Sequence, residues 1–90
     1  MNRILVILTI DIDNLPTNFQ EILKLERAAV GQWKTEGILD QLFLRKTKNG
    51  AVLIFKELEE EKVLELMKTL PFYQLKKSME VFSLIKDSEF

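Results

Sequence analysis

The 90-residue sequence has no cysteine and no histidine, and only three glycines and two prolines. Without cysteine it has no disulfide and no thiol nucleophile, and without histidine it lacks imidazole acid–base chemistry and the usual zinc ligands. The glycines, Gly31, Gly37 and Gly50, form no phosphate-binding loop. Any catalysis must therefore rest on carboxylates, lysine, arginine, tyrosine or hydroxyl groups, or on a borrowed cofactor.

Charge of either sign is balanced, with 13 Lys+Arg against 14 Asp+Glu and a net charge of -1. The basic residues are scattered rather than gathered into a stripe, so we expect no nucleic-acid partner. The apolar run Ile4–Ile10 is far shorter than the roughly 20 residues that cross a bilayer. Asp11 and Asp13 follow where a signal peptide would have its cleavage site. We therefore expect a cytoplasmic protein with no membrane partner.

Hydrophobic periodicity predicts four strands and two helices in the order β-α-β-β-α-β. Thr17 and Gln20 have capping-box spacing, so the first helix is expected to start there and to run to Gly37. Asn49-Gly50 predicts a tight hairpin between the middle strands. The elements expected after the first strand, Ile4–Ile10, are strands Ile38–Thr47, Ala51–Glu57 and Ser78–Ile85, and a helix Glu59–Leu70 that Pro71 ends.

This element order is typical of the α+β ferredoxin-like plan, a four-stranded antiparallel sheet with both helices on one face, here as a single domain over residues 1–90. Both faces of the strands are apolar, and alternation divides the second strand into Leu42 and Leu44 against Leu39 and Phe43. A second copy is the simplest cover for the face without helices. We predict a homodimer or higher homo-oligomer, although exposed apolar residues are also ordinary on monomers.

Glu26 is the polar residue that interrupts the apolar side of the first helix. At 100° per residue it lies near the middle of an arc formed by Phe19, Ile22, Leu23, Val30 and Trp33. A carboxylate in that position has a raised pKa unless a cation meets it, and such groups concentrate at functional sites. The alternative is an ion pair with Arg45, Lys56 or Arg27 that fixes the packing of helix on sheet.

Few other residues are candidates for chemistry. Phe72 and Tyr73 follow Pro71 and can wall a pocket, in which Tyr73 offers a hydroxyl donor. Trp33 is at core spacing, where packing is the simpler role than stacking on a ligand. Glu59, Glu60 and Glu61 point around a helix rather than at one ion, so we expect no metal site and no cofactor.

Over about residues 4 to 85 the chain resembles the muconolactone isomerase-like proteins of the dimeric α+β barrel superfamily. The shared features occur in the same order. They are the helix glutamate Glu26, Glu36-Gly37 at the helix end, a hairpin ending in Phe55, and Leu70-Pro71-Phe72 before a last strand. The resemblance implies the barrel fold and an enzyme that moves a double bond in an unsaturated lactone, with Glu26 as the base.

The resemblance does not transfer the substrate, because Leu39, Asp40 and Gln41 replace an aromatic, basic and imidazole-bearing stretch of the family enzyme. Our first hypothesis is a small-molecule isomerase that acts next to a carbonyl, with Glu26 as the acid–base group. The residues expected to bind its substrate are Gln41, Arg45, Phe72, Tyr73 and Trp33. The alternatives are a non-catalytic ligand-binding or assembly module of the same fold, and a cofactor-independent monooxygenase.

Overall fold

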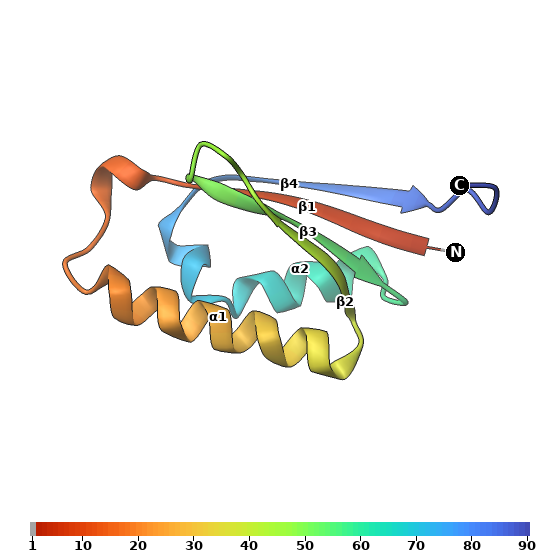
Figure 1. The fold of residues 1–90 in the computed structure, drawn as a ribbon, viewed down its shortest axis with the longest axis horizontal. Helices are drawn as coiled ribbons and strands as arrows, with labels where there is room; N and C mark the ends of the chain where they lie inside the picture. Colours follow the sequence, from red (N-terminus) through yellow and green to blue (C-terminus); the bar gives the residue numbers. More distant parts are fainter. Residues whose placement is uncertain (1) are drawn as a thin grey trace.

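A four-stranded antiparallel sheet forms one layer of the molecule and two helices form the other (Figure 1). The computed structural model describes residues 2–90. The strands are β1 (Asn2–Ile10), β2 (Leu39–Leu44), β3 (Gly50–Lys56) and β4 (Lys76–Ile85), in the spatial order β2-β3-β1-β4. The helices α1 (Phe19–Glu36) and α2 (Glu60–Lys68) lie on the same face, which confirms the ferredoxin-like plan.

β1 supplies the centre of the core because it pairs with β3 on one side and β4 on the other. Its even-numbered residues Ile4, Val6, Leu8 and Ile10 are each at most 5% exposed beneath the helices. The side chains that complete this core are Trp33, Leu39, Leu53, Phe55, Val63, Met67 and Leu70. The odd-numbered residues of β1 point to the opposite face of the sheet, since side chains alternate along a strand.

The face away from the helices is apolar as well. Leu5 and Ile7 are half-buried there, and Phe82, which pairs with Leu5, is 46% exposed. Phe43 of β2 and Leu84 of β4 are 52% and 43% exposed. No helix covers this face (Figure 1). Its exposed apolar side chains confirm the two apolar faces that the sequence predicts.

The helix boundaries differ from the expected ones at their starts. The prediction that Thr17 caps the first helix is wrong, because α1 begins at Phe19 with Asn18 at the cap position and no side-chain cap bond. The Phe19 amide instead donates to the Pro16 carbonyl at 3.1 Å, which makes Thr17 and Asn18 part of a preceding turn. Gly37 ends α1 as predicted, in the left-handed conformation with φ 81°.

The second helix ends slightly earlier than expected, at Lys68, with Thr69 at its C-cap. Pro71 then opens a short 3-10 helix, η2 (Pro71–Leu75), and does not merely terminate α2. Proline is favoured in a first helical turn, where no intrahelical partner awaits its missing N–H. A second 3-10 helix, η1 (Ile12–Asn14), follows β1, and both short helices connect strands and helices at one end of the sheet.

The antiparallel hairpin between β2 and β3 is confirmed, but its connection is longer than the expected Lys48-Asn49-Gly50, because β2 ends at Leu44. Lys48 takes a left-handed conformation within it, with φ 62°. Gly50 is already the first residue of β3 and pairs with Thr9. A Cβ atom at Gly50 would lie 2.0 Å from the Leu8 carbonyl oxygen. Glycine is required here because β1 approaches closely, rather than because the chain turns.

β2 also departs from simple alternation. Its register shifts between Leu39, which pairs with Phe55, and Gln41, which pairs with Ile54. Leu39 is therefore buried beneath the helices, at 2% exposure, on the same face as Leu42. The expected grouping of Leu39 with Phe43 is wrong, since the bulge moves the later side chains to the opposite face.

Gly50→Ala should destabilise the fold by at least about 1–3 kcal/mol, because the new Cβ collides with the β1 backbone. The matched control is Gly31→Ala in α1, where a Cβ meets nothing within 4 Å. That substitution should add about 0.5–1 kcal/mol through helix propensity. Urea unfolding of both variants measures the difference, and equal stabilities would contradict the close approach.

Candidate functional site

A pocket of about 510 Å³ lies between α1 and the part of the sheet formed by β2, β3 and β1. Its walls are largely apolar side chains. These are Phe72 of η2 and, from α1 and the three strands, Leu8, Ile10, Phe19, Leu23, Val30, Leu39, Leu42, Leu44, Ala51 and Leu53. Its polar lining residues are Glu26, Arg27, Lys34, Gln41, Arg45 and Lys48. Apolar walls with a few polar groups are typical of small-molecule sites.

Glu26 is 8% exposed, and it is the one buried charged residue of the part of the chain that the structure describes. Its Oε1 atom accepts a hydrogen bond from the Phe72 backbone N–H at 2.9 Å. Burial raises the pKa of the Glu26 carboxyl, and the Phe72 hydrogen bond opposes that rise without overcoming it. The neutral acid is thus favoured more strongly than in an exposed glutamate.

No cation offsets this burial. Within residues 2–90 the ion pairs are Arg3–Asp40 and Lys62–Glu65, so Glu26 is not paired with Arg45, Lys56 or Arg27. The alternative interpretation, in which an ion pair at Glu26 fixes the packing of helix on sheet, therefore does not describe this structure. A buried carboxyl group with a single backbone partner is a costly arrangement for structure alone.

The local sequence explains how the Phe72 amide reaches Glu26. Pro71 occupies the first turn of η2, where backbone N–H groups have no intrahelical partner. The Phe72 amide is one of these groups, and it points at the carboxyl of α1. The Phe72 ring stacks on Phe19 of the same helix, with centroids 5.6 Å apart and planes at 20°. The two contacts hold η2 against α1 at the position of Glu26.

The structure brings together four of the residues expected from sequence: Glu26, Gln41, Arg45 and Phe72 all line the pocket. Arg45 also donates from Nη1 to the Thr9 hydroxyl at 2.9 Å. The other two do not line this pocket. Trp33 is 6% exposed in the core, with its ring 5.5 Å from that of Phe55, and Tyr73 lies under the Lys76 ammonium at 4.7 Å.

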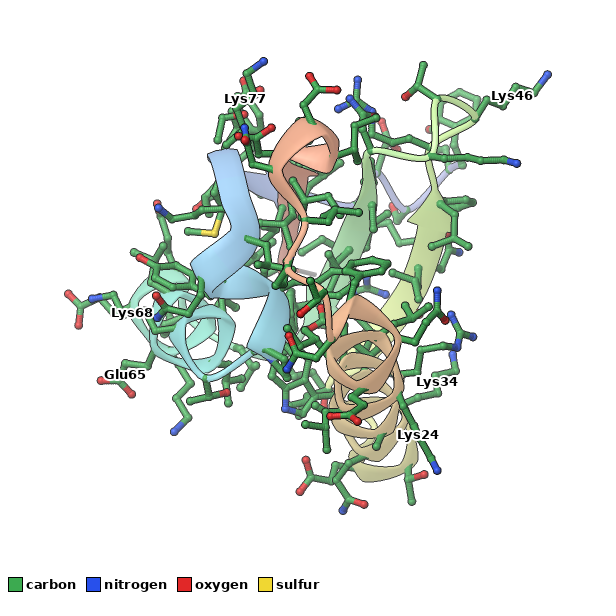
Figure 2. All side chains as sticks on the ribbon, turned by 90° about the vertical axis from the view of Figure 1, so that its left-hand side faces the viewer. Lys24, Lys34, Lys46, Glu65, Lys68 and Lys77 are labelled. Atoms are coloured by element: carbon green, nitrogen blue, oxygen red, sulfur yellow. The ribbon has the colours of Figure 1, made fainter. Side chains whose placement is uncertain are left out.

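Three basic pocket residues were not among the expected site residues. Arg27 and Lys34, with Gly31 between them, recur at helical spacing along the side of α1 that faces the pocket. Figure 2 shows Lys34 on the side of the molecule where the β2–β3 hairpin lies, away from α2. The sequence alone could have revealed Arg27 and Lys34 through this helical spacing. Lys48 carries no such signal in the sequence, because it belongs to an irregular connection.

Over residues 2–90 there is no group of three or more Asp and Glu side chains placed to hold a metal ion, and Glu59, Glu60 and Glu61 form no such group. Neither of the helices in that range is long and apolar enough to cross a membrane.

The comparison with known proteins rests on structure, since no protein-family model and no curated protein matches the sequence. Muconolactone isomerase is similar at 15% identity and a TM-score of 0.78, over 100% of this chain and 94% of that chain. A 5-chloro-2-hydroxyhydroquinone dehydrochlorinase from Burkholderia phenoliruptrix, solved with 2,5-dihydroxybenzoquinone, is similar at 14% identity and a TM-score of 0.64, over 97% and 96%.

An antibiotic biosynthesis monooxygenase is similar at 16% identity and a TM-score of 0.60, over 97% of this chain and 99% of that chain. These proteins share the ferredoxin-like α+β barrel fold. The fold that the resemblance to the muconolactone isomerase-like family implied is therefore confirmed. The three names cover different reactions, so the likeness defines the fold and the choice of reaction depends on the site.

The raised pKa of Glu26 predicts a pH-dependent stability. The pKa of Glu26 is higher in the folded than in the unfolded protein. Its contribution to the free energy of unfolding is therefore fully present below about pH 4.3 and is lost as the pH rises through the folded pKa. Glu26→Gln stays neutral, so its stability advantage over the unchanged protein should grow between pH 4 and pH 8. Urea unfolding across this range measures it, and a constant difference would contradict the burial effect.

Proposed function

We propose that the protein is an enzyme that transfers a proton at a carbon next to a carbonyl or lactone group, with Glu26 as the acid–base residue. The observation that supports this proposal is a buried carboxyl group in an apolar pocket with a backbone N–H as partner and no cation. General acid–base catalysis is most efficient when the pKa of the group lies near the working pH. Burial moves the pKa of Glu26 in that direction.

In the proposed reaction the ionised Glu26 removes a proton from the carbon beside the carbonyl, and the electron pair of that C–H bond becomes part of an enolate. The Phe72 N–H holds Oε1, which leaves Oε2 for the substrate. Gln41 and Arg45 line the pocket, but Gln41 lies on the same strand face as Phe43 and Arg45 is bonded to Thr9. Arg27 of α1 is therefore the donor that we propose stabilises the enolate oxygen. Glu26 then returns the proton to a different carbon, so the double bond moves and the carboxylate is restored.

The remaining pocket residues point to an anionic substrate of modest size. Arg27 and Lys48 add positive charge to the lining, while Glu26 is its one acidic residue among the described residues. Leucine and phenylalanine side chains form the opposite walls. This combination suits an apolar ring or unsaturated chain that carries a carboxylate.

Glu26→Gln should lower the rate of proton exchange into a bound carboxylate-bearing unsaturated lactone in D₂O by about 10²–10⁴-fold. The amide keeps the size of the side chain and an acceptor for the Phe72 N–H, so the melting temperature should stay equal or rise. NMR detection of deuterium uptake measures the exchange. The matched control is Glu21→Gln, an exposed glutamate of the same helix.

The outcomes separate the competing functions. Exchange that is equally fast in both variants would contradict the proposal. Ligand binding without any exchange in the unchanged protein would support the non-catalytic module instead. Consumption of oxygen with a quinol substrate would support the monooxygenase alternative.

We further propose that the protein acts as a single-domain homodimer in the cytoplasm, with the open sheet face buried between two copies. The chain exposes 6366 Å², whereas a monomer of 10.6 kDa is expected to expose about 5,500 Å². The excess is comparable to the roughly 800 Å² that each partner buries in a standard interface. It coincides with the exposed Phe43, Phe82 and Leu84 on one face.

Phe82→Asp should therefore convert the dimer, of twice 10.6 kDa, into a monomer, because it places a charge on the apolar face that the two copies share. Leu25→Asp is the matched control, since Leu25 is 62% exposed on α1, away from that face. Sedimentation equilibrium measures both masses. A dimer that survives Phe82→Asp but not Leu25→Asp would place the interface on the helices.

A further inference from the structure

The bulge in β2 determines which of its side chains face the pocket. The register steps from the Leu39–Phe55 pair to the Gln41–Ile54 pair, so Asp40 is the added residue. Beyond it, Leu42 pairs with Leu53 and Leu44 with Ala51, and both leucines line the pocket. An added residue shifts every later side chain to the opposite face, so this wall of the pocket depends on Asp40.

Without the bulge, different β2 side chains would line the pocket. Regular alternation from Leu39 would pair Phe43 with Ala51 and turn its ring into the pocket, while Leu42 and Leu44 would move to the open face. In the structure Phe43 pairs with Val52 on the open face and is 52% exposed. The two registers thus give pockets of different shape from the same strand.

Hydrophobic burial favours the bulged register, because regular alternation would turn Gln41 and Phe43 towards the helices in place of Leu42 and Leu44. The gain is limited, since Leu42 and Leu44 remain 36% and 69% exposed. The bulge also takes the Asp40 carbonyl out of the ladder, so a polar contact must complete it.

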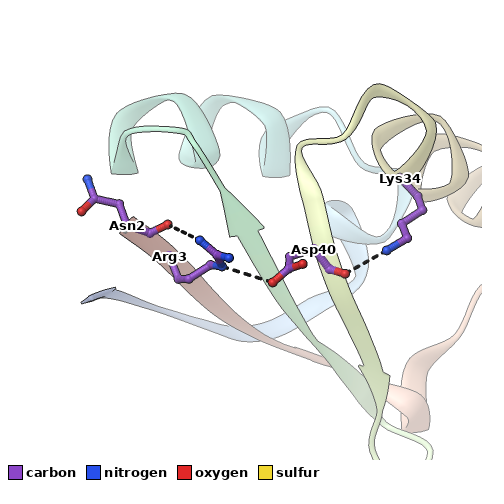
Figure 3. Close-up of polar contacts among 4 residues, drawn as sticks. All are labelled: Asn2, Arg3, Lys34 and Asp40. Carbon is purple, nitrogen blue, oxygen red and sulfur yellow. Dashed lines mark hydrogen bonds and ion pairs between the residues drawn. The ribbon is translucent and has the colours of Figure 1, made fainter. Parts of the chain in front are cut away.

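Two cations meet Asp40 from different elements, as Figure 3 shows. Lys34 of α1 donates from Nζ to the Asp40 carbonyl oxygen at 2.9 Å. Arg3 of β1 donates from Nε to the Asp40 carboxylate at 3.1 Å, and from Nη1 to the Asn2 carbonyl oxygen at 3.0 Å. The Arg3 and Asp40 side chains are 13% and 30% exposed, so water screens their ion pair less than it screens a surface pair.

The bond from Lys34 is specific to the bulged register. In a regular ladder the carbonyl of residue 40 would accept from the amide of its partner on β3, whereas a bulged residue drops out of the ladder and its carbonyl needs another donor. Lys34 supplies that donor. Arg3, which pairs with Lys56 at the end of β1, adds an ion pair that holds the Asp40 side chain at that end of the sheet.

We propose that Lys34 and Arg3 are positioning residues that hold the bulge at Asp40 and so determine which β2 side chains form the pocket wall. This inference deepens the proposed function, since it rests on the pocket being the substrate site and assigns the control of its shape. The register itself is measurable without a substrate. If the proton-exchange experiment on Glu26 fails, the test of the β2 register can still succeed. If the register test fails, the proton-exchange result still stands.

The test compares the double variant Lys34→Met/Arg3→Met with the unchanged protein by NOE spectroscopy of the methyl and aromatic protons. The Phe43-ring-to-Val52 and Leu42-to-Leu53 NOEs should fall by at least half, and a Phe43-ring-to-Ala51 NOE should appear. The matched control is Lys24→Met/Lys62→Met, which removes two exposed lysines from the helices. Its NOE pattern should remain that of the unchanged protein.

The conservative variant Lys34→Arg/Arg3→Lys keeps both donors and should restore the original NOEs. If the double methionine variant does not fold, the same NOEs are read in Lys34→Met alone, where a second set of resonances for residues 41–44 is expected. Original NOEs at full intensity in the methionine variants, with no Phe43-to-Ala51 contact, would overturn the proposal. So would a loss of NOEs that the arginine and lysine exchange does not restore.

Discussion

The burial of the Glu26 carboxyl is the constraint on which the site depends. A carboxylate that leaves water without a cation partner must gain hydrogen bonds or take up a proton. Here one backbone N–H, from Phe72, meets it at 2.9 Å, and burial still raises its pKa. The position of η2 against α1, the stacking of Phe72 on Phe19 and the apolar walls of the pocket all serve to keep this one group dry.

A second constraint comes from the sheet, which is apolar on both faces while both helices lie on one (Figure 1). Within the sheet, β1 and β3 approach each other so closely that Gly50 has no room for a Cβ atom. The pocket lies between α1 and the sheet and extends to β2. This edge strand forms a wall of the pocket, and polar contacts from α1 and β1 meet at its bulged residue Asp40.

The element order, the end of α1 at Gly37 and the placement of Glu26 in the interior all followed from periodicity and from single-residue preferences. The parts that did not follow depend on contacts between distant segments. The bulge at Asp40 depends on Lys34 and Arg3, which come from other elements. The partner of Glu26 is a backbone amide 46 positions away, and a backbone amide has no signature in the sequence. Side-chain periodicity likewise could not separate Phe72, which lines the pocket, from Tyr73, which does not.

The pKa of Glu26 in the folded protein tests the central claim most directly. A site-resolved titration of its side-chain carboxyl carbon by ¹³C NMR, in the folded and in the urea-unfolded protein, measures it without any substrate or variant. The structure predicts that the Glu26 carboxyl titrates at a higher pH in the folded protein, because burial outweighs the single hydrogen bond from Phe72. A Glu26 carboxyl that titrates at the same pH in both states, or at a lower pH when folded, would contradict the account of a buried acid without a cation partner.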